Sequence, residues 1–172
     1  MIQLTPQVVL ATSGMQADAD ALRKTLDYRI KMYQHNHNCY PSVFALNRLL
    51  SNTLYYKRFF PYYTFNLLAG VDPATGEGVV FNYDAIGSDE RVDGSVAGTG
   101  GVLMRAFMDN QVDFKNQTGV PKRPLAAEEA ISLVKDAFAS ATERDMFTGD
   151  SVDILLIRSA GISQENMPLR RD

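Results

Sequence analysis

The order of its helical and extended segments is the feature that most constrains how this chain can fold. Apolar side chains at helical spacing, or a glycine turn leading into a helical stretch, predict helices over residues 15–34, 41–54, 102–112 and 127–141. β-Branched, aromatic or continuous apolar runs predict strands over residues 8–11, 62–70, 78–83 and 151–158. A further short strand is expected near residues 90–97, and the stretch after Gly161 is either a weak closing strand or a tail. Helices grouped between antiparallel hairpins predict an α+β fold with helices packed on sheets.

The size and composition of the chain favour one compact domain over residues 1–172. Hydrophobic residues make up 45% and charged residues 22% of the sequence, which is close to the globular average and argues against disorder. The only cysteine, Cys39, permits no intrachain disulfide. Together with the lack of a recognisable leader, this predicts an intracellular protein.

The charge pattern argues against nucleic acids and membranes as partners. The net charge is -3, and the lysines and arginines are scattered rather than gathered into a basic stripe that could follow a phosphate backbone. No apolar run approaches the ~20 residues needed to cross a bilayer. We therefore expect a soluble protein that binds neither.

Two clusters have some features of ligand sites. Residues 98–101 form a glycine-rich loop before a helix, but Leu103 stands where a dinucleotide fingerprint needs glycine, and no phosphate-loop lysine follows. We interpret this loop as a structural turn, although it is the one feature that favours a free-standing ligand-binding domain. His35, His37 and Cys39 alternate in a polar stretch predicted to link the first two helices, without a second cluster to complete a site. We therefore expect no metal and no other cofactor.

A third cluster joins the last predicted helix to the strand that follows. It contains Glu143, Asp145, Thr148 and Asp150. Such a corner can orient a nucleophile, but charges and hydroxyls at a helix end more often satisfy local backbone groups. The residues alone favour the structural interpretation.

Several short motifs together resemble the proteasome beta subunits over essentially the whole chain. They are Ser13-Gly14-Met15-Gln16-Ala17-Asp18, Arg29-Ile30-Lys31-Met32-Tyr33, Arg58-Phe59-Phe60-Pro61-Tyr62-Tyr63, Ala69-Gly70-Val71-Asp72, Tyr83-Asp84-Ala85-Ile86-Gly87-Ser88, Asp109-Asn110-Gln111-Val112 and Ala141-Thr142-Glu143-Arg144-Asp145. The motifs at residues 59–63 and 109–112 are specific enough to indicate the non-catalytic member at the sixth position of the beta ring.

The resemblance implies both a fold and a role. The fold is a four-layer α-β-β-α sandwich of the N-terminal nucleophile hydrolase type, in which the first strands would lie upstream of Met1, so we expect this sequence to lack the front of its domain. The role is assembly into the 20S core particle, which serves ubiquitin-dependent protein degradation. Its implied partners are other beta subunits in the same and the opposite ring and the alpha subunits, in the cytoplasm and nucleus.

By the same resemblance, the chain lacks the catalytic groups of active members. These members use an N-terminal threonine as nucleophile, assisted by a lysine. Gln3 stands at the position of that lysine, and the nucleophile would lie upstream of Met1. We therefore predict a non-catalytic subunit. The alternative is an active threonine endopeptidase whose nucleophile is missing from this sequence.

Other positions match residues that assist the catalytic groups of active members without reacting themselves. Gly14 matches the glycine whose N–H stabilises the oxyanion in active members, and Thr99 matches the serine beside the nucleophile. Asp145 and Thr148 match the aspartate and serine that orient that nucleophile. We interpret them, with Gln3, as vestigial site positions.

The resemblance also implies an indirect role in substrate recognition. The sixth subunit of this family borders the substrate channel of the adjacent chymotrypsin-like subunit, with a segment that matches residues 84–88. Asp84 and Ser88 are therefore predicted to contact the side chain of a bound peptide or inhibitor without performing chemistry.

Overall fold

The computed structural model describes residues 1–170 of the chain. These residues fall into two compact units, and each is described by itself. The first contains residues 1–92 and 157–162, and the second contains residues 93–156 and the chain from Ser163. The expectation of a single domain over residues 1–172 stays a prediction.

The first unit is built on a five-stranded antiparallel sheet. In spatial order, its strands are β1 (Ile2–Thr5), β2 (Val8–Gly14), β3 (Thr64–Val71), β4 (Gly78–Tyr83) and β5 (Asp89–Val92). The turn between β3 and β4 is held by Asp72, whose carboxylate accepts the N–H of Ala74 and the hydroxyl of Thr75, both at 3.0 Å. The spatial order of the five strands is thus the same as their order in the sequence.

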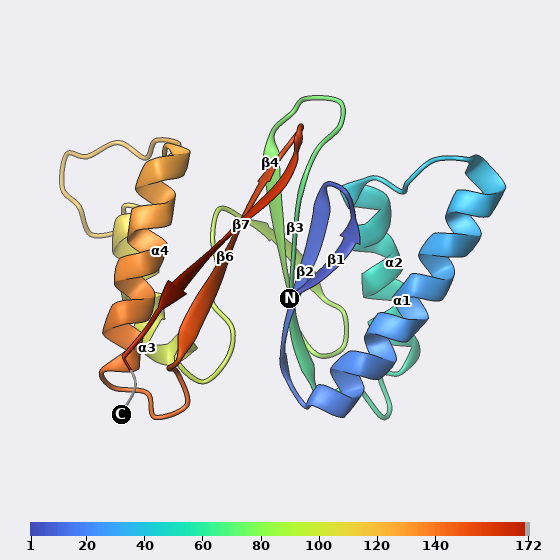
Figure 1. Cartoon of the computed structure of the whole chain (residues 1–172), viewed down its shortest axis with the longest axis horizontal. Helices are drawn as coiled ribbons and strands as arrows, with labels where there is room; N and C mark the ends of the chain where they lie inside the picture. Colours follow the sequence, from blue (N-terminus) through green and yellow to red (C-terminus); the bar gives the residue numbers. More distant parts are fainter. Residues whose placement is uncertain (171–172) are drawn as a thin grey trace. The chain divides into compact units, whose positions relative to one another are not determined.

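Two helices, α1 (Gln16–His37) and α2 (Val43–Tyr56), pack against this sheet (Figure 1). Helix α1 contacts β1 and β2, and α2 contacts β3 and β4. Their buried apolar side chains recur every four residues, so that one face of each helix is apolar: Leu22, Leu26 and Ile30 on α1, and Leu46, Leu50 and Leu54 on α2. These side chains, with Leu10, Leu68 and Phe81 of the sheet, form the core.

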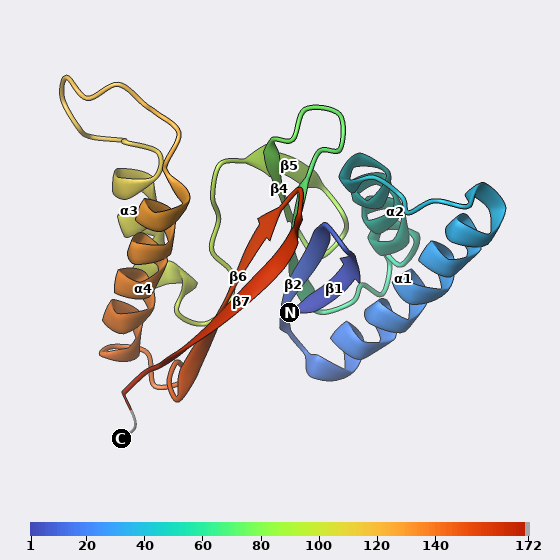
Figure 2. The ribbon, with the colours of Figure 1, turned by 45° about the horizontal axis from the view of Figure 1, so that its top comes forward.

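The second unit contains the other two helices, α3 (Gly101–Gln111) and α4 (Ala127–Thr142), which contact each other (Figure 2). The strands β6 (Ser151–Arg158) and β7 (Gly161–Pro168) form a two-stranded sheet. Its tip, residues 157–162, is grouped with the first unit and the rest with the second. Ala137 and Ala141, four residues apart, are the buried side chains of α4.

The α+β class predicted from the sequence is confirmed: residues 1–170 form four helices, and the predicted strands are in place. The chain also begins with β1, which was not predicted, although Ile2 and Leu4 alternate with the polar Gln3 and Thr5; the run is only four residues long, the shortest length at which alternation indicates a strand. The extended segment expected near residues 90–97 is the shorter β5, and the stretch after Gly161 is strand β7 rather than a tail.

The ends of the first two helices differ from the prediction for a local reason. Helix α1 continues through His37 instead of ending near Gln34, because Asn38 adopts a left-handed conformation (φ 53°) and caps the helix by donating its N–H to the Gln34 carbonyl at 2.8 Å. Helix α2 begins at Val43 rather than at Pro41. Ser42 is its N-cap, and its hydroxyl accepts the N–H of Ala45 at 3.2 Å.

None of the helices within residues 1–170 is long and apolar enough to cross a membrane.

Candidate functional site

Gln3 lies on the edge strand β1, opposite Val9 of β2, and its side chain is exposed. Within residues 1–170 it forms no side-chain hydrogen bond or ion pair. A neutral amide carries no positive charge that could lower the pKa of a neighbouring nucleophile. The residue at this position therefore cannot assist proton loss as a lysine would.

Gly14 ends β2, at the point where the chain turns into α1. Its φ is +111°, a conformation that favours glycine, and a Cβ atom added there would lie 2.3 Å from the carbonyl oxygen of Tyr63. The same carbonyl accepts the N–H of Met15 at 2.8 Å, so the two backbones are held in close contact. The local structure alone requires glycine at this position.

Thr99, Asp145 and Thr148 lie together in the second unit. The hydroxyls of Thr99 and Thr148 both donate to Oδ2 of Asp145, at 2.6 Å and 2.7 Å, and the N–H of Phe147 donates to Oδ1 at 3.3 Å. One carboxylate thus joins the corner after α4 to the loop before α3. The corner satisfies a local backbone group, as expected for a helix end, but the Asp145 carboxylate also accepts from Thr99, which is 46 residues away in sequence.

These hydrogen bonds hold the pKa of the Asp145 carboxyl below its ordinary value, with the Thr99 hydroxyl as the largest cause and the Thr148 hydroxyl as the second. A carboxylate held in its charged form can accept hydrogen bonds and so orient the hydroxyls that donate them. Within residues 1–170 it has no lysine, histidine or cysteine partner. The trio has the geometry of a support for a site rather than of a nucleophile with its base.

The depressed pKa makes a prediction about stability at acidic pH. Replacing Asp145 with asparagine should destabilise the protein at neutral pH, and the difference from wild type should shrink as the pH falls below about 4. The reason is that Asp145 stabilises the fold fully above its unfolded-state pKa and loses that effect as it protonates near its lower folded-state pKa. Urea denaturation of both proteins between pH 7 and pH 3 measures this.

Asp136→Asn is the matched control, because the Asp136 side chain lies on α4 and forms no hydrogen bond or ion pair within residues 1–170. It should show no such pH-dependent difference. A destabilisation by Asp145→Asn that stays constant down to pH 3 would contradict the role given to the charged carboxylate.

The segment of residues 84–88 is a tight loop between β4 and β5, and Asp84 organises it. Oδ1 of Asp84 accepts the N–H groups of Ile86 and Ser88, at 3.1 Å and 2.8 Å. Its backbone N–H donates to the carbonyl of Ser88 at 3.1 Å. Asp84 and Ser88 are both exposed, and within residues 1–170 neither Oδ2 of Asp84 nor the Ser88 hydroxyl forms a hydrogen bond. Those two groups are available to a ligand or partner.

Helix α2 anchors this loop, which the sequence did not reveal. The Ser51 hydroxyl donates to the carbonyl of Gly87 at 2.6 Å, and a Cβ on Gly87 would lie 2.5 Å from the Ser51 carbonyl oxygen. Gly87 also has a φ of +91°. A serine on a helix face gives no sequence signal for such a role, because its partner is 36 residues away.

Next to the loop lies a buried polar network that sequence reasoning also missed. Asn47 of α2 donates from Nδ2 to the Asp89 carboxylate at 2.9 Å, and its side-chain oxygen accepts the Tyr83 hydroxyl. Burial raises the pKa of Tyr83, and the nearby Asp89 charge raises it further. The network ties α2 to both strands that flank residues 84–88, which makes the loop rigid.

The histidines and the cysteine do not form a metal site. His35 and His37 belong to α1 rather than to an interhelical loop, and residues two apart on a helix point to different faces. His37 instead packs against Tyr33, with ring centroids 4.4 Å apart, and Cys39 is exposed. Residues 1–170 contain no group of three or more histidine, cysteine, aspartate or glutamate side chains that could hold a metal ion.

The glycine loop at residues 98–101 turns into α3 with Gly100 as N-cap. It borders a cavity of about 290 Å³ whose walls include the apolar side chains of Met104, Met108 and Phe138. A Cβ on Gly100 would lie 3.3 Å from Oδ2 of Asp145, so a carboxylate is close to the loop. That negative charge opposes phosphate binding, which agrees with the structural interpretation.

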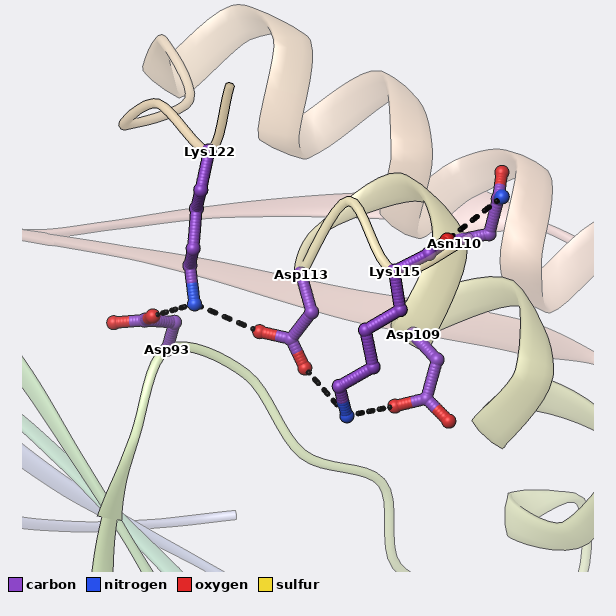
Figure 3. A network of polar contacts seen from close by, with 6 residues as sticks. All are labelled: Asp93, Asp109, Asn110, Asp113, Lys115 and Lys122. Carbon is purple, nitrogen blue, oxygen red and sulfur yellow. Dashed lines mark hydrogen bonds and ion pairs between the residues drawn. The ribbon is translucent and has the colours of Figure 1, made fainter. Parts of the chain in front are cut away.

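The motif at residues 109–112 ends α3 and takes part in a charged network (Figure 3). Lys115 bridges Asp109 at 2.8 Å and Asp113 at 3.4 Å, while Lys122 bridges Asp113 at 3.1 Å and also pairs with Asp93. The two lysines, with Lys122 the larger cause, lower the pKa of the Asp113 carboxyl. The network holds the loop after α3 in place and contains no free nucleophile.

Comparison with known proteins defines the class of this protein. The family model described as "Proteasome subunit" matches residues 1–157. The chain therefore belongs to the proteasome subunit family.

Relatives give a more particular similarity. The chain is 51% identical to "Proteasome subunit beta type-1" of Petunia hybrida, in an alignment that covers 100% of this chain and 78% of the relative. It is 49% identical to the protein of the same name in Arabidopsis thaliana, with 99% and 78% covered. "Proteasome subunit beta type-6" of Saccharomyces cerevisiae is 40% identical, with 96% and 72% covered.

Proposed function

We propose that this chain is a non-catalytic subunit of the 20S proteasome beta ring and contributes to protein degradation by assembling with other subunits. The observation that carries the proposal is Gln3, which stands where the resemblance to active beta subunits places a lysine, and which is exposed on β1 without a charged partner within residues 1–170. The trio of Thr99, Asp145 and Thr148 supports this proposal, because it supplies hydrogen bonds but no nucleophile and no base.

The proposed fold, partners and location all follow from membership of the proteasome subunit family. We propose a four-layer α-β-β-α sandwich, which the two antiparallel sheets and the two pairs of helices support by supplying elements of the kinds that such a fold needs. The partners are beta subunits of the same and the opposite ring and the alpha subunits, with this chain at the sixth ring position. The proposed location is the cytoplasm and nucleus.

A finer part of the proposal concerns the loop at residues 84–88. We propose that it borders the substrate pocket of the adjacent active subunit, with Oδ2 of Asp84 and the Ser88 hydroxyl facing the bound peptide. Both groups are exposed and unbonded within residues 1–170, while Oδ1 of Asp84 and the Ser51 anchor hold the loop in one conformation. A rigid loop with two free polar groups suits side-chain recognition.

Native purification of the tagged chain tests the assembly role and the absence of catalysis together. The 19.1 kDa chain should elute in a particle many times its mass, with other proteasome subunits. When that particle is treated with an electrophile that reacts with N-terminal threonine nucleophiles, neighbouring subunits should be labelled and this chain should not. A lone monomer would contradict the assembly role, and labelling of this chain would favour the active endopeptidase.

A further inference from the structure

Two polar side chains of α2, Asn47 and Ser51, point away from their own helix in their hydrogen bonding. They are four residues apart, so they lie on one face of α2, next to the buried Leu50 and Leu54. Both donate to partners 36 or more residues away in sequence, at the loop of residues 84–88 or the strand that follows it. Polar groups beside an apolar core are retained where such partners replace water. These two bonds therefore act on the loop rather than on α2.

The Ser51 hydroxyl holds one peptide group inside the loop. It donates to the carbonyl of Gly87 at 2.6 Å, and Gly87 is itself buried against the helix. The carbonyl of Gly87 and the N–H of Ser88 belong to the same planar peptide group. A hydrogen bond that fixes the carbonyl therefore also fixes the direction in which the Ser88 N–H points.

That N–H carries the constraint on to Asp84. It donates to Oδ1 of Asp84 at 2.8 Å. The Ser51 hydroxyl, the peptide group and the carboxylate thus form a chain of two hydrogen bonds, and such chains strengthen their members by mutual polarisation. Because Oδ1 and Oδ2 belong to one rigid carboxylate, the chain orients Oδ2 as well. Ser51 therefore acts on a group that it does not touch.

Asn47 fixes a different part of the same structure. Tyr83, the last residue of β4, is paired in register with Asp89, the first residue of β5. Asn47 accepts the Tyr83 hydroxyl and donates to the Asp89 carboxylate at 2.9 Å. This network sets where the loop begins and ends. The orientation of the peptide group within the loop depends on Ser51.

We propose that Ser51 is a positioning residue for substrate selectivity at the adjacent active subunit. Through the peptide group between Gly87 and Ser88, it orients the Asp84 carboxylate toward the bound peptide. The inference rests on the proposed function, because it takes the loop to border that substrate pocket. It adds a residue of α2, behind the loop, that sets how strongly the pocket distinguishes charged side chains.

A double-mutant cycle in the assembled particle tests this role. The probes are two fluorogenic peptides that differ only by lysine or glutamate, at the position where Asp84→Asn changes selectivity most. Ser51→Ala should lower the lysine-over-glutamate ratio of kcat/KM by about twofold, because the carboxylate keeps its charge and loses only its orientation. In the Asp84→Asn background, Ser51→Ala should change the ratio no further, since no charge is left to orient.

Thr53→Val is the matched control on the same helix. The Thr53 hydroxyl also donates at 2.6 Å, but to the Leu49 carbonyl within α2, and valine keeps the shape of the side chain. This variant should leave the ratio unchanged. Hydrogen exchange in the particle gives a second readout, in which Ser51→Ala should speed exchange of the Ile86 and Ser88 N–H groups about fivefold relative to wild type and Thr53→Val.

The outcomes separate the inference from the proposed function. If Asp84→Asn leaves the ratio unchanged at every peptide position, the proposed pocket is wrong and the inference falls with it. If Asp84→Asn changes the ratio but Ser51→Ala does not, or if their effects add, the positioning role is wrong while the pocket stands. Unchanged hydrogen exchange, or an equal change with Thr53→Val, also overturns it. If Ser51→Ala does not enter the particle at wild-type level, Ser51→Cys, a weaker donor, takes its place and is judged by the same ratio.

Discussion

Alanine in place of Gly14 is expected to lower the free energy of unfolding by about 3 kcal/mol. A non-glycine residue held in an unfavourable backbone conformation costs on the order of 1–3 kcal/mol, and relieving a steric overlap adds to that. At Gly14 both effects act, because φ is +111° and the new Cβ would lie 2.3 Å from the Tyr63 carbonyl oxygen. That carbonyl cannot move freely, since it accepts the N–H of Met15. Urea denaturation at neutral pH gives the difference.

Two other glycines separate the two contributions. At Gly78 no atom lies within 4 Å of the place that a Cβ would occupy and φ is not positive, so Gly78→Ala should change stability little. Gly119 also has open space but a φ of +78°, so Gly119→Ala should cost about 1 kcal/mol from backbone strain alone. If Gly14→Ala costs no more than Gly119→Ala, steric necessity does not explain this glycine, and its match to an oxyanion position becomes the better explanation.

The second large effect is expected at Asp84. Alanine there should lower the free energy of unfolding by about 1–2 kcal/mol, because two backbone N–H groups lose their acceptor. Asparagine keeps a side-chain oxygen in the same place and should preserve the loop. Ser88→Ala is the control, since the Ser88 hydroxyl forms no hydrogen bond within residues 1–170 and its loss should leave stability unchanged.

Asp84→Asn then tests the proposed pocket without disturbing the loop. In the assembled particle, it should reduce the preference of the adjacent site for peptides with a basic side chain over an acidic one by about two- to fivefold, the scale of an exposed charge pair. The measurement is the ratio of kcat/KM for the two peptides. An unchanged ratio, in a particle that contains the variant at wild-type level, would show that Asp84 does not face the peptide.

The sequence was most informative about individual elements. Helix α2 could be predicted because Leu46, Leu50 and Leu54 repeat at helical spacing, and that spacing reflects a buried stripe wherever the helix packs. The β3–β4 hairpin could be predicted for a similarly local reason, its turn residues around Asp72. The helix ends were less certain, because Asn38 and Ser42 act as caps only through particular backbone hydrogen bonds.

The candidate site could be predicted only in part. The resemblance picked out Thr99, Asp145 and Thr148, and the structure joins the two threonine hydroxyls to the one carboxylate. Nothing in the sequence indicated that Ser51 would anchor the loop of residues 84–88, or that Asn47 would be buried against Tyr83. Both are polar residues on an otherwise apolar helix face, and their partners are 36 residues away.

The sequence by itself determined the order of helices and strands, the α+β class, the resemblance to proteasome beta subunits, and a neutral Gln3 at the position where that resemblance implies a lysine in active members. Each of these depends on local spacing or on the identity of single residues. Only the tertiary structure decided that Gly14 is required by a close backbone contact, that Asp145 ties two distant loops together, and that Phe59 and Phe60 face outward. These depend on which segments meet in space, and local periodicity carries no information about that.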